Sequence, residues 1–220
     1  MTTTAGAVEI PLGHTALNGD LTGPDCEAMV VFAHGSGSSR HSPRNRQVAA
    51  RLRRTGLGTL LLDLLTEEEE AVDIRTAELR FDIGLLASRL ALAVEWLDRQ
   101  PGAAARPVGM FGASTGAAAA LTTAAQQGDR VGAIVSRGGR PDLAGDALSA
   151  VRAPTLLIVG GRDPVVHDLN VQACEQMRCE RRLDVVPGAT HPFEEPGTLD
   201  RVSELAADWF GRHLGVRRER

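Results

Sequence analysis

The stretch from Pro107 to Gly116 constrains the fold of this chain more than any other part of it. An apolar run there ends at Gly112, a glycine-flanked serine follows at position 114, and an alanine-rich segment comes next at residues 117–125. This order predicts a strand, a sharp turn with Ser114 at its apex, and a helix. Glycines suit both sides of such a turn because its backbone is strained and neighbouring chains approach it closely. The stretch therefore predicts a nucleophile elbow, which presents the serine hydroxyl to solvent at the edge of a sheet.

Apolar runs and helical patterns alternate along the rest of the chain. Mostly apolar runs predict buried strands at residues 28–33, 58–62, 131–136 and 155–159. Shorter strands are expected at residues 8–10, 15–21 and 183–186, with Asn18-Gly19 as a turn or bulge. Helices are expected at residues 43–55 after a Ser42 cap, 83–97 after an Asp82 cap, 117–128, 142–151, 168–178 and 198–214. This alternation predicts an α/β fold with a doubly wound, mostly parallel sheet and helices on both faces.

The polar segment 66–80 interrupts this alternation. It carries four successive glutamates, Glu67 to Glu70, and such charge runs are usually solvated faces. We expect an exposed connection with at most a helical turn, and the sequence leaves open whether it covers the site as a lid.

Length and composition indicate one domain in a reducing compartment. The 220 residues contain no linker-like tract and no repeat, so we expect a single domain over 1–220 with frayed ends at 1–6 and 215–220. The three cysteines are an odd number without metal-ligand spacing, and the N-terminus lacks a secretory pattern, which predicts a cytoplasmic location and no metal. A net charge of −4 argues against a nucleic-acid or membrane-surface binder. The chain has no lysine, so Schiff-base chemistry through a lysine is excluded.

Four loops at the carboxyl ends of the predicted strands hold residues suited to nucleophilic catalysis. They contain His34-Gly35-Ser36, Ser114, Asp163 and His191. Loops at these strand ends form the active edge of an open parallel sheet. A serine hydroxyl is a weak nucleophile at neutral pH and needs an imidazole base, which a carboxylate must orient. We therefore assign Ser114 as nucleophile, His191 as base and Asp163 as orienting acid, with Asp142 as the competitor for the last role.

The chain resembles the α/β-hydrolase superfamily, and within it the dienelactone hydrolase-like branch. The resemblance covers about Val8 to Leu214 and depends on Gly112–Gly116, Gly160–Asp163 and Gly188–Pro192 in their strand contexts, with the order Ser, Asp, His along the chain. Dienelactone hydrolase itself has a cysteine nucleophile where this chain has serine, which puts the dienelactone substrate in doubt.

The resemblance implies an oxyanion hole made of backbone N–H groups. These belong to Thr115, the residue after the nucleophile, and to Ser36, after His34-Gly35. His34 itself is expected to brace its loop. Larger members of the superfamily insert a cap domain in the connection that here runs from Arg137 to Ala153. This connection is short, so no substantial cap domain is expected.

Three cationic or titratable residues are candidates for binding an anionic group of the substrate: Arg40, His41 and Arg137. The alternative is that they are ordinary surface or loop-bracing residues.

The leading hypothesis is a serine hydrolase that cleaves a small carboxylic ester, lactone or thioester through an acyl-enzyme without a cofactor. One alternative keeps these residues but transfers the acyl group or cyclises it, and another is a catalytically silent protein that binds a ligand in the same cleft. Epoxide or haloalkane hydrolysis would require an aspartate at position 114. The expected partner is a small-molecule substrate, with neither nucleic acid nor membrane, and homodimerisation is left open.

Overall fold

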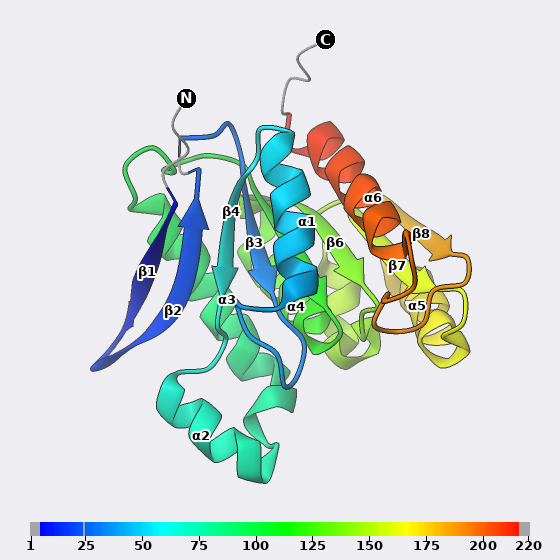
Figure 1. The fold of residues 1–220 in the computed structure, drawn as a ribbon, viewed down its shortest axis with the longest axis horizontal. Helices are drawn as coiled ribbons and strands as arrows, with labels where there is room; N and C mark the ends of the chain where they lie inside the picture. The colour runs from blue at the N-terminus through cyan, green and yellow to red at the C-terminus, as the bar shows by residue number, and fades with distance from the viewer. Residues whose placement is uncertain (1–4, 24, 216–220) are drawn as a thin grey trace.

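Eight strands form one sheet in the order β1-β2-β4-β3-β5-β6-β7-β8 (Figure 1). The computed structural model describes residues 5–23 and 25–215 of the chain. The strands are β1 Ala5–Leu12, β2 Thr15–Thr22, β3 Met29–Ala33, β4 Gly58–Leu62, β5 Val108–Ala113, β6 Val131–Arg137, β7 Thr155–Gly160 and β8 Arg181–Val186. Strand β2 pairs antiparallel with β1 and β4, whereas every pair from β4 to β8 across the sheet is parallel. The expected doubly wound, mostly parallel sheet is confirmed, and its parallel strands end along one edge.

The turn of the N-terminal hairpin does not lie at Asn18-Gly19, where the sequence predicts a turn or bulge. Strand β2 runs continuously through Asn18 and Gly19, which pair with β1, and the turn lies at Gly13 and His14. Gly13 adopts a φ of 59°, which glycine tolerates in a two-residue hairpin loop. Gly19 instead serves packing, because a Cβ there would lie 3.1 Å from Leu60 Cδ1. The Asn-Gly pair is therefore part of a strand.

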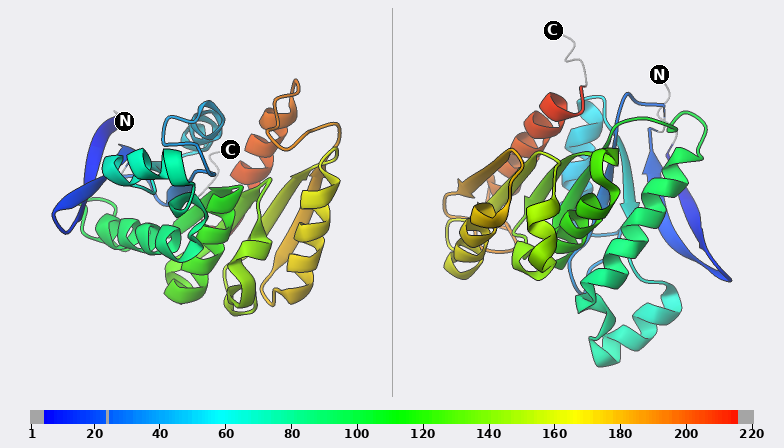
Figure 2. Two further views of the ribbon diagram at one scale, coloured as in Figure 1. Left: turned by 90° about the horizontal axis from the view of Figure 1, so that it is seen from below. Right: turned by 180° about the vertical axis from the view of Figure 1, so that it is seen from behind.

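Helices cover both faces of the sheet (Figure 2). They are α1 Pro43–Arg54, α2 Glu67–Thr76, α3 Ile83–Asp98, α4 Thr115–Gln127, α5 Pro164–Gln176 and α6 Thr198–His213, with 3-10 helices η1 Leu79–Phe81, η2 Gly128–Arg130 and η3 Pro141–Ala150. Helices α1 and α6 pack on one face over an apolar core that includes Phe32, Phe111 and Phe210. Helices α3, α4 and α5 pack on the other face around Met110 and Leu157. Each large side chain buried in these cores contributes about 1.5–3 kcal/mol of transfer free energy.

Caps set the starts of three helices. Ser42 caps α1 ahead of Pro43, and Asp82 accepts a hydrogen bond from Leu85 N at the start of α3, as the sequence predicts. The start of α5 differs from the expectation of residue 168. The helix begins at Pro164 because Asp163 is its N-cap and a proline is favourable in the first turn.

Segment 66–80 is more ordered than the sequence predicts. It forms the ten-residue helix α2 and the short helix η1 beyond the carboxyl end of β4 (Figure 1). Thr66 and Glu69 form a reciprocal capping box, and Glu69 also pairs with Arg89 of α3 at 2.6 Å. Asp73 is the buried residue of α2 and forms an ion pair with Arg80. The expectation of at most a helical turn is wrong, because local capping and ion pairing replace the apolar face that usually marks a helix.

The connection after β6 is short, as the sequence predicts, and contains η3. This element is a 3-10 helix kinked at Gly145, where φ is 52°, so the expected helix over 142–151 is not a regular α-helix. No cap domain lies in this connection, which leaves the site uncovered on this side.

The two edges of the sheet are β1 and β8. On β8, Arg181 and Arg182 are exposed. Of the ends expected to be frayed, residues 1–4 and 216–220 lie outside the described residues, whereas Ala5 and Gly6 belong to β1. None of the helices in residues 5–23 and 25–215 combines the length and apolarity that crossing a membrane requires.

Candidate active site

Ser114 stands between β5 and α4 in a strained backbone conformation. Its φ of 50° and ψ of −121° are costly for a residue with a side chain, by about 1–3 kcal/mol. Three backbone hydrogen bonds hold it there. Its N–H donates to Arg137 O at 3.3 Å, and its carbonyl accepts from Ala117 N and Arg140 N, both at 3.1 Å. The serine is therefore fixed at the apex of the predicted turn.

Glycines allow neighbouring chains to cross this turn. A Cβ at Gly116 would collide with the carbonyl oxygens of Ala33 and His34, so the end of β3 and the start of α4 could not approach as they do. A Cβ at Gly35 would lie 3.0 Å from Ser114 Cβ. The loop after β3 thus passes directly against the serine, and the missing side chains of Gly35 and Gly116 make room for this contact.

His191 and Asp163 form a hydrogen-bonded pair. The Nδ1 atom of His191 lies 2.7 Å from Asp163 Oδ2, and the carboxylate requires that Nδ1 carry the proton. The other carboxylate oxygen, Oδ1, accepts from Val166 N at 3.4 Å and caps α5. The aspartate side chain is 15% exposed and the histidine side chain 45%, so the pair has a partly buried acid and an accessible imidazole. In the neutral imidazole this tautomer has its lone pair on Nε2, which is the atom a base needs.

Gly138 brings His191 to the elbow. It follows Arg137, whose carbonyl accepts the Ser114 N–H. A Cβ at Gly138 would lie 3.2 Å from His191 O and 3.5 Å from His191 Cε1.

Within the described residues no hydrogen bond joins Ser114 Oγ to His191 Nε2, and such bonds often tighten only when substrate binds.

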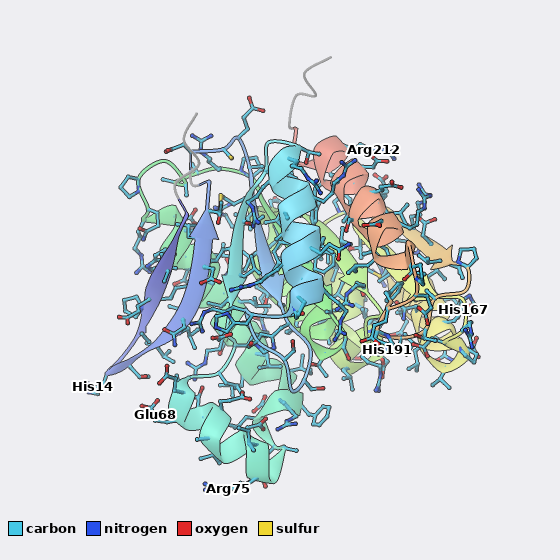
Figure 3. All side chains as sticks on the ribbon, viewed as in Figure 1. His14, Glu68, Arg75, His167, His191 and Arg212 are labelled. Atoms are coloured by element: carbon cyan, nitrogen blue, oxygen red, sulfur yellow. The ribbon has the colours of Figure 1, made fainter. Side chains whose placement is uncertain are left out.

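A carboxylate that sequence reasoning missed holds the loop of His191. Glu195 accepts hydrogen bonds from both Thr190 Oγ1 at 2.6 Å and Thr190 N at 3.1 Å, and these bonds lower the pKa of its carboxyl. The loop itself lies between β8 and α6, at the edge where the parallel strands end (Figure 3). In the sequence Glu195 follows directly after Glu194, and such a pair is typical of an ordinary charged surface. The sequence therefore contains no sign that Glu195 supports the loop of His191.

The amides expected to form the oxyanion hole have no competing partner. Within residues 5–23 and 25–215, the N–H groups of Ser36 and Thr115 have no hydrogen-bond acceptor. His34 braces the loop that carries Ser36. Its Nδ1 donates to Gly35 O at 2.9 Å, and its Nε2 accepts from Leu64 N at 3.1 Å. Burial lowers the pKa of His34, and with both ring nitrogens engaged it is not placed to act as a second base.

A small pocket lies between the loop that carries Ser36 and segment 66–81. Its lining includes Gly35, Ser36, Gly37, Glu70, Asp73 and Arg80. Arg80 is held by Asp73, through Nε to Oδ2 at 2.6 Å and through Nη2 to the backbone carbonyl at 2.7 Å. The sequence left open whether this segment covers the site, and the structure places part of it in the lining of this pocket.

The three candidate anion-binding residues differ in their surroundings. Arg40 forms an ion pair with Asp63, and His41 Nδ1 lies 2.8 Å from Arg46 Nη2. Arg137 is nine-tenths buried, and burial lowers its pKa to about 10. Arg40 and Arg137 are thus not presented freely to a substrate, whereas the side chain of His41 is exposed.

Asp142, the competitor for the acid, is paired with Arg140 through both carboxylate oxygens, at 2.9 and 2.7 Å. It makes no hydrogen bond to His191 within the part of the chain described. In the same residues, no group of three or more histidine, cysteine or acidic side chains is placed to hold a metal ion.

A parallel sheet with this strand order, a strained serine after its β5 strand and a histidine on the loop after its last strand define the α/β-hydrolase fold. The model of the dienelactone hydrolase family matches residues 17–214. The chain therefore belongs to the dienelactone hydrolase family. A dienelactone hydrolase from Anabaena variabilis ATCC 29413 is 54% identical, with a TM-score of 0.94 over 97% of this chain and 100% of that one.

Two further similarities differ in what they show. "Putative phosphoribosyl transferase Rv0571c" of Mycobacterium tuberculosis is 58% identical over 208 residues, which are 94% of this chain and 46% of that protein. The chain thus spans about half the length of this curated relative. Est1E from Butyrivibrio proteoclasticus is 17% identical, with a TM-score of 0.78 over 96% of this chain and 99% of that one. At that identity the likeness shows the fold alone.

Proposed function

We propose that this chain is a serine hydrolase that cleaves a small carboxylic ester, lactone or thioester through an acyl-enzyme. The observation that carries the proposal is the strained Ser114 beside the hydrogen-bonded pair of His191 and Asp163. A carboxylate hydrogen-bonded to Nδ1 has a clear use when the other ring nitrogen must accept a proton. The esterase and hydrolase relatives support the reaction class.

In the proposed reaction, Ser114 Oγ attacks the carbonyl carbon of the substrate while His191 Nε2 takes the hydroxyl proton. The carbonyl oxygen becomes an oxyanion and accepts hydrogen bonds from the N–H groups of Ser36 and Thr115, aided by the N-terminus of α4. Collapse of this intermediate expels the alcohol or thiol, which receives the proton from His191. Water then attacks the acyl-enzyme by the same route and releases the acid and free Ser114.

These steps need neither a metal nor a cofactor, since each proton moves between serine, histidine, leaving group and water. The three free cysteines, Cys26, Cys174 and Cys179, support a reducing cytoplasmic location. The name of the mycobacterial relative describes a protein more than half of which this chain does not match. We attribute the transferase activity in that name to the unmatched part.

The test is covalent labelling of Ser114. A fluorophosphonate probe should label the wild-type chain at this residue, and Ser114→Ala should abolish both labelling and cleavage of p-nitrophenyl acetate. Ser149→Ala is the matched control, because that serine is exposed and its hydroxyl donates to Asp146 O. Labelling or turnover that survives in Ser114→Ala would refute the proposal.

The same assay separates hydrolysis from acyl transfer. Adding a small alcohol or amine as acceptor should leave the acid as the main product of the wild-type chain. A product that is mostly the transferred ester or amide would favour the acyltransferase alternative. Specific ligand binding without labelling or turnover would favour the silent binding protein.

A further inference from the structure

Arg137 is linked to both reacting residues of the proposed site. It is the last residue of β6 and pairs in register with Ala113 of the elbow strand. Its carbonyl oxygen accepts the N–H of Ser114 at 3.3 Å. Its side chain reaches the turn that carries His191, where Nη1 lies 3.5 Å from Pro192 O and Cζ lies 5.9 Å from the centroid of the Phe193 ring.

The turn that Arg137 supports is strained. Phe193 donates its N–H to Thr190 O, which closes a four-residue turn around His191 and Pro192. Phe193 is buried and has a φ of 57°, a conformation that side-chain-bearing residues rarely adopt. Such a conformation persists only where the surroundings hold it. Glu195 holds one side of the turn through Thr190, and Arg137 lies against the other.

The guanidinium of Arg137 is a buried cation without a carboxylate. Within the described residues it forms no salt bridge, and its Nε atom is buried without a hydrogen-bond acceptor. Glu194, the acidic residue directly after the turn, forms its ion pair with the neighbouring Arg44 and not with Arg137. Burial, with a further contribution from Arg44, lowers the pKa of Arg137 to about 10, and the side chain still carries its charge at neutral pH. Burying an unpaired charge is costly, so this position calls for an explanation beyond packing.

We propose that Arg137 is a positioning residue that sets the imidazole of His191 relative to the hydroxyl of Ser114. The inference rests on the proposed hydrolase function and assigns Arg137 a role different from substrate binding. The backbone of this residue fixes the nucleophile, and its guanidinium supports the turn of the base through a carbonyl and an aromatic face. A shift of about 1 Å between reacting groups costs on the order of 100-fold in rate, so this support acts on the chemical step.

The test compares Arg137→Met with the wild type on two p-nitrophenyl esters, one neutral and one with a free carboxylate. Methionine keeps apolar contact with Phe193 but removes the charge and the donor. We expect kcat to fall by about 10- to 100-fold on both esters with KM within about twofold, because the loss lies in the transition state. Fluorophosphonate labelling of Ser114 should slow by a similar factor, and Arg137→Lys should recover part of it. Arg152→Met is the control, since that exposed arginine pairs with Asp129, away from the proposed site.

Three outcomes would overturn the inference. An unchanged kcat in Arg137→Met would show that the turn does not need the guanidinium. A rise in KM confined to the anionic ester would make Arg137 a substrate-binding residue. If Arg137→Met does not fold, Arg137→Gln replaces it, and failure of both to fold would show a purely structural role. Ester cleavage that survives Ser114→Ala would instead refute the proposed function, so the two failures are distinguishable.

Discussion

If the proposed function holds, replacing Asp163 with asparagine should abolish ester cleavage without unfolding the chain. Asp163 uses one carboxylate oxygen to accept from Val166 N and the other to accept from His191 Nδ1. In the Asp163→Asn variant, the backbone N–H of Val166 selects the carbonyl oxygen of the new side-chain amide, which turns the NH₂ group of that amide toward His191. A donor facing Nδ1 forces the proton onto Nε2. The imidazole is then in the tautomer that cannot accept the proton of Ser114.

The magnitudes follow from these two contacts. Loss of the correct tautomer in such a triad lowers kcat by about 10⁴-fold, or about 5 kcal/mol of transition-state stabilisation. Asparagine caps helices about as well as aspartate, so the variant loses only the charge at the N-terminus of α5, about 0.3–1 kcal/mol. For a chain of this length that is a decrease in Tm of no more than about 4 °C.

The assay is kcat on p-nitrophenyl acetate together with a thermal melt. Asp142→Asn is the matched control. It breaks a partly exposed pair with Arg140, which is worth about 0–1 kcal/mol, and it should leave kcat within about tenfold. If Asp163→Asn retained kcat within about tenfold of wild type, or if Asp142→Asn were the more damaging change, the acid would have been assigned to the wrong strand.

Three further predictions concern substrate size, pH and backbone packing. The short connection after β6 leaves the cleft open, so the roughly 0.8 kcal/mol per buried methylene should accrue only for the first carbons, and kcat/KM should favour acetyl to butyryl esters over those of about ten or more carbons. A preference that rises through the long chains would instead indicate that α2 covers the substrate. Burial lowers the pKa of His34 in the native chain below its ordinary value of 6.5. At a pH between the native and the unfolded pKa, the unfolded chain therefore binds a proton that the native chain does not. The unfolding free energy measured in urea should therefore fall as the pH drops below 6.5, and it should fall less steeply in His34→Gln than in the wild type. Equal pH slopes for the two proteins would contradict this prediction. Gly116→Ala should lower the unfolding free energy by about 1–3 kcal/mol or more, because the added Cβ meets two carbonyl oxygens, and an unchanged urea midpoint would contradict that packing.

The sheet and the sheet edge that carries the candidate site residues were predictable because their signals are local. Continuous apolar runs mark strands buried on both faces, and the strands β3, β4, β5, β6 and β7 all lie at such runs. Once the strands are placed, parallel pairing brings their following loops to one edge. That step alone places Asp163 and His191 near each other, and the structure joins them by a hydrogen bond.

The parts that sequence reasoning missed depend on contacts between distant side chains. Helix α2 has little apolar face, and its order comes from the capping box at Thr66 and from the ion pairs of Glu69 and Asp73. The support of His191 by Glu195 depends on a loop conformation that no periodic pattern announces. The burial of Arg137 likewise follows from the placement of Phe193 over its guanidinium, which the sequence of β6 alone does not show.

The charged outer strand has a consequence for how copies of this chain meet. A strand at the end of a sheet offers unpaired backbone groups that can template the addition of a strand from another molecule. Strand β8 carries exposed Arg181 and Arg182, and Arg182 pairs with Asp184 at 2.9 Å. An incoming strand would bury these charges or break their pairing, so β8 resists edge-to-edge growth. The exposed charges therefore disfavour growth of the sheet into an aggregate through this side.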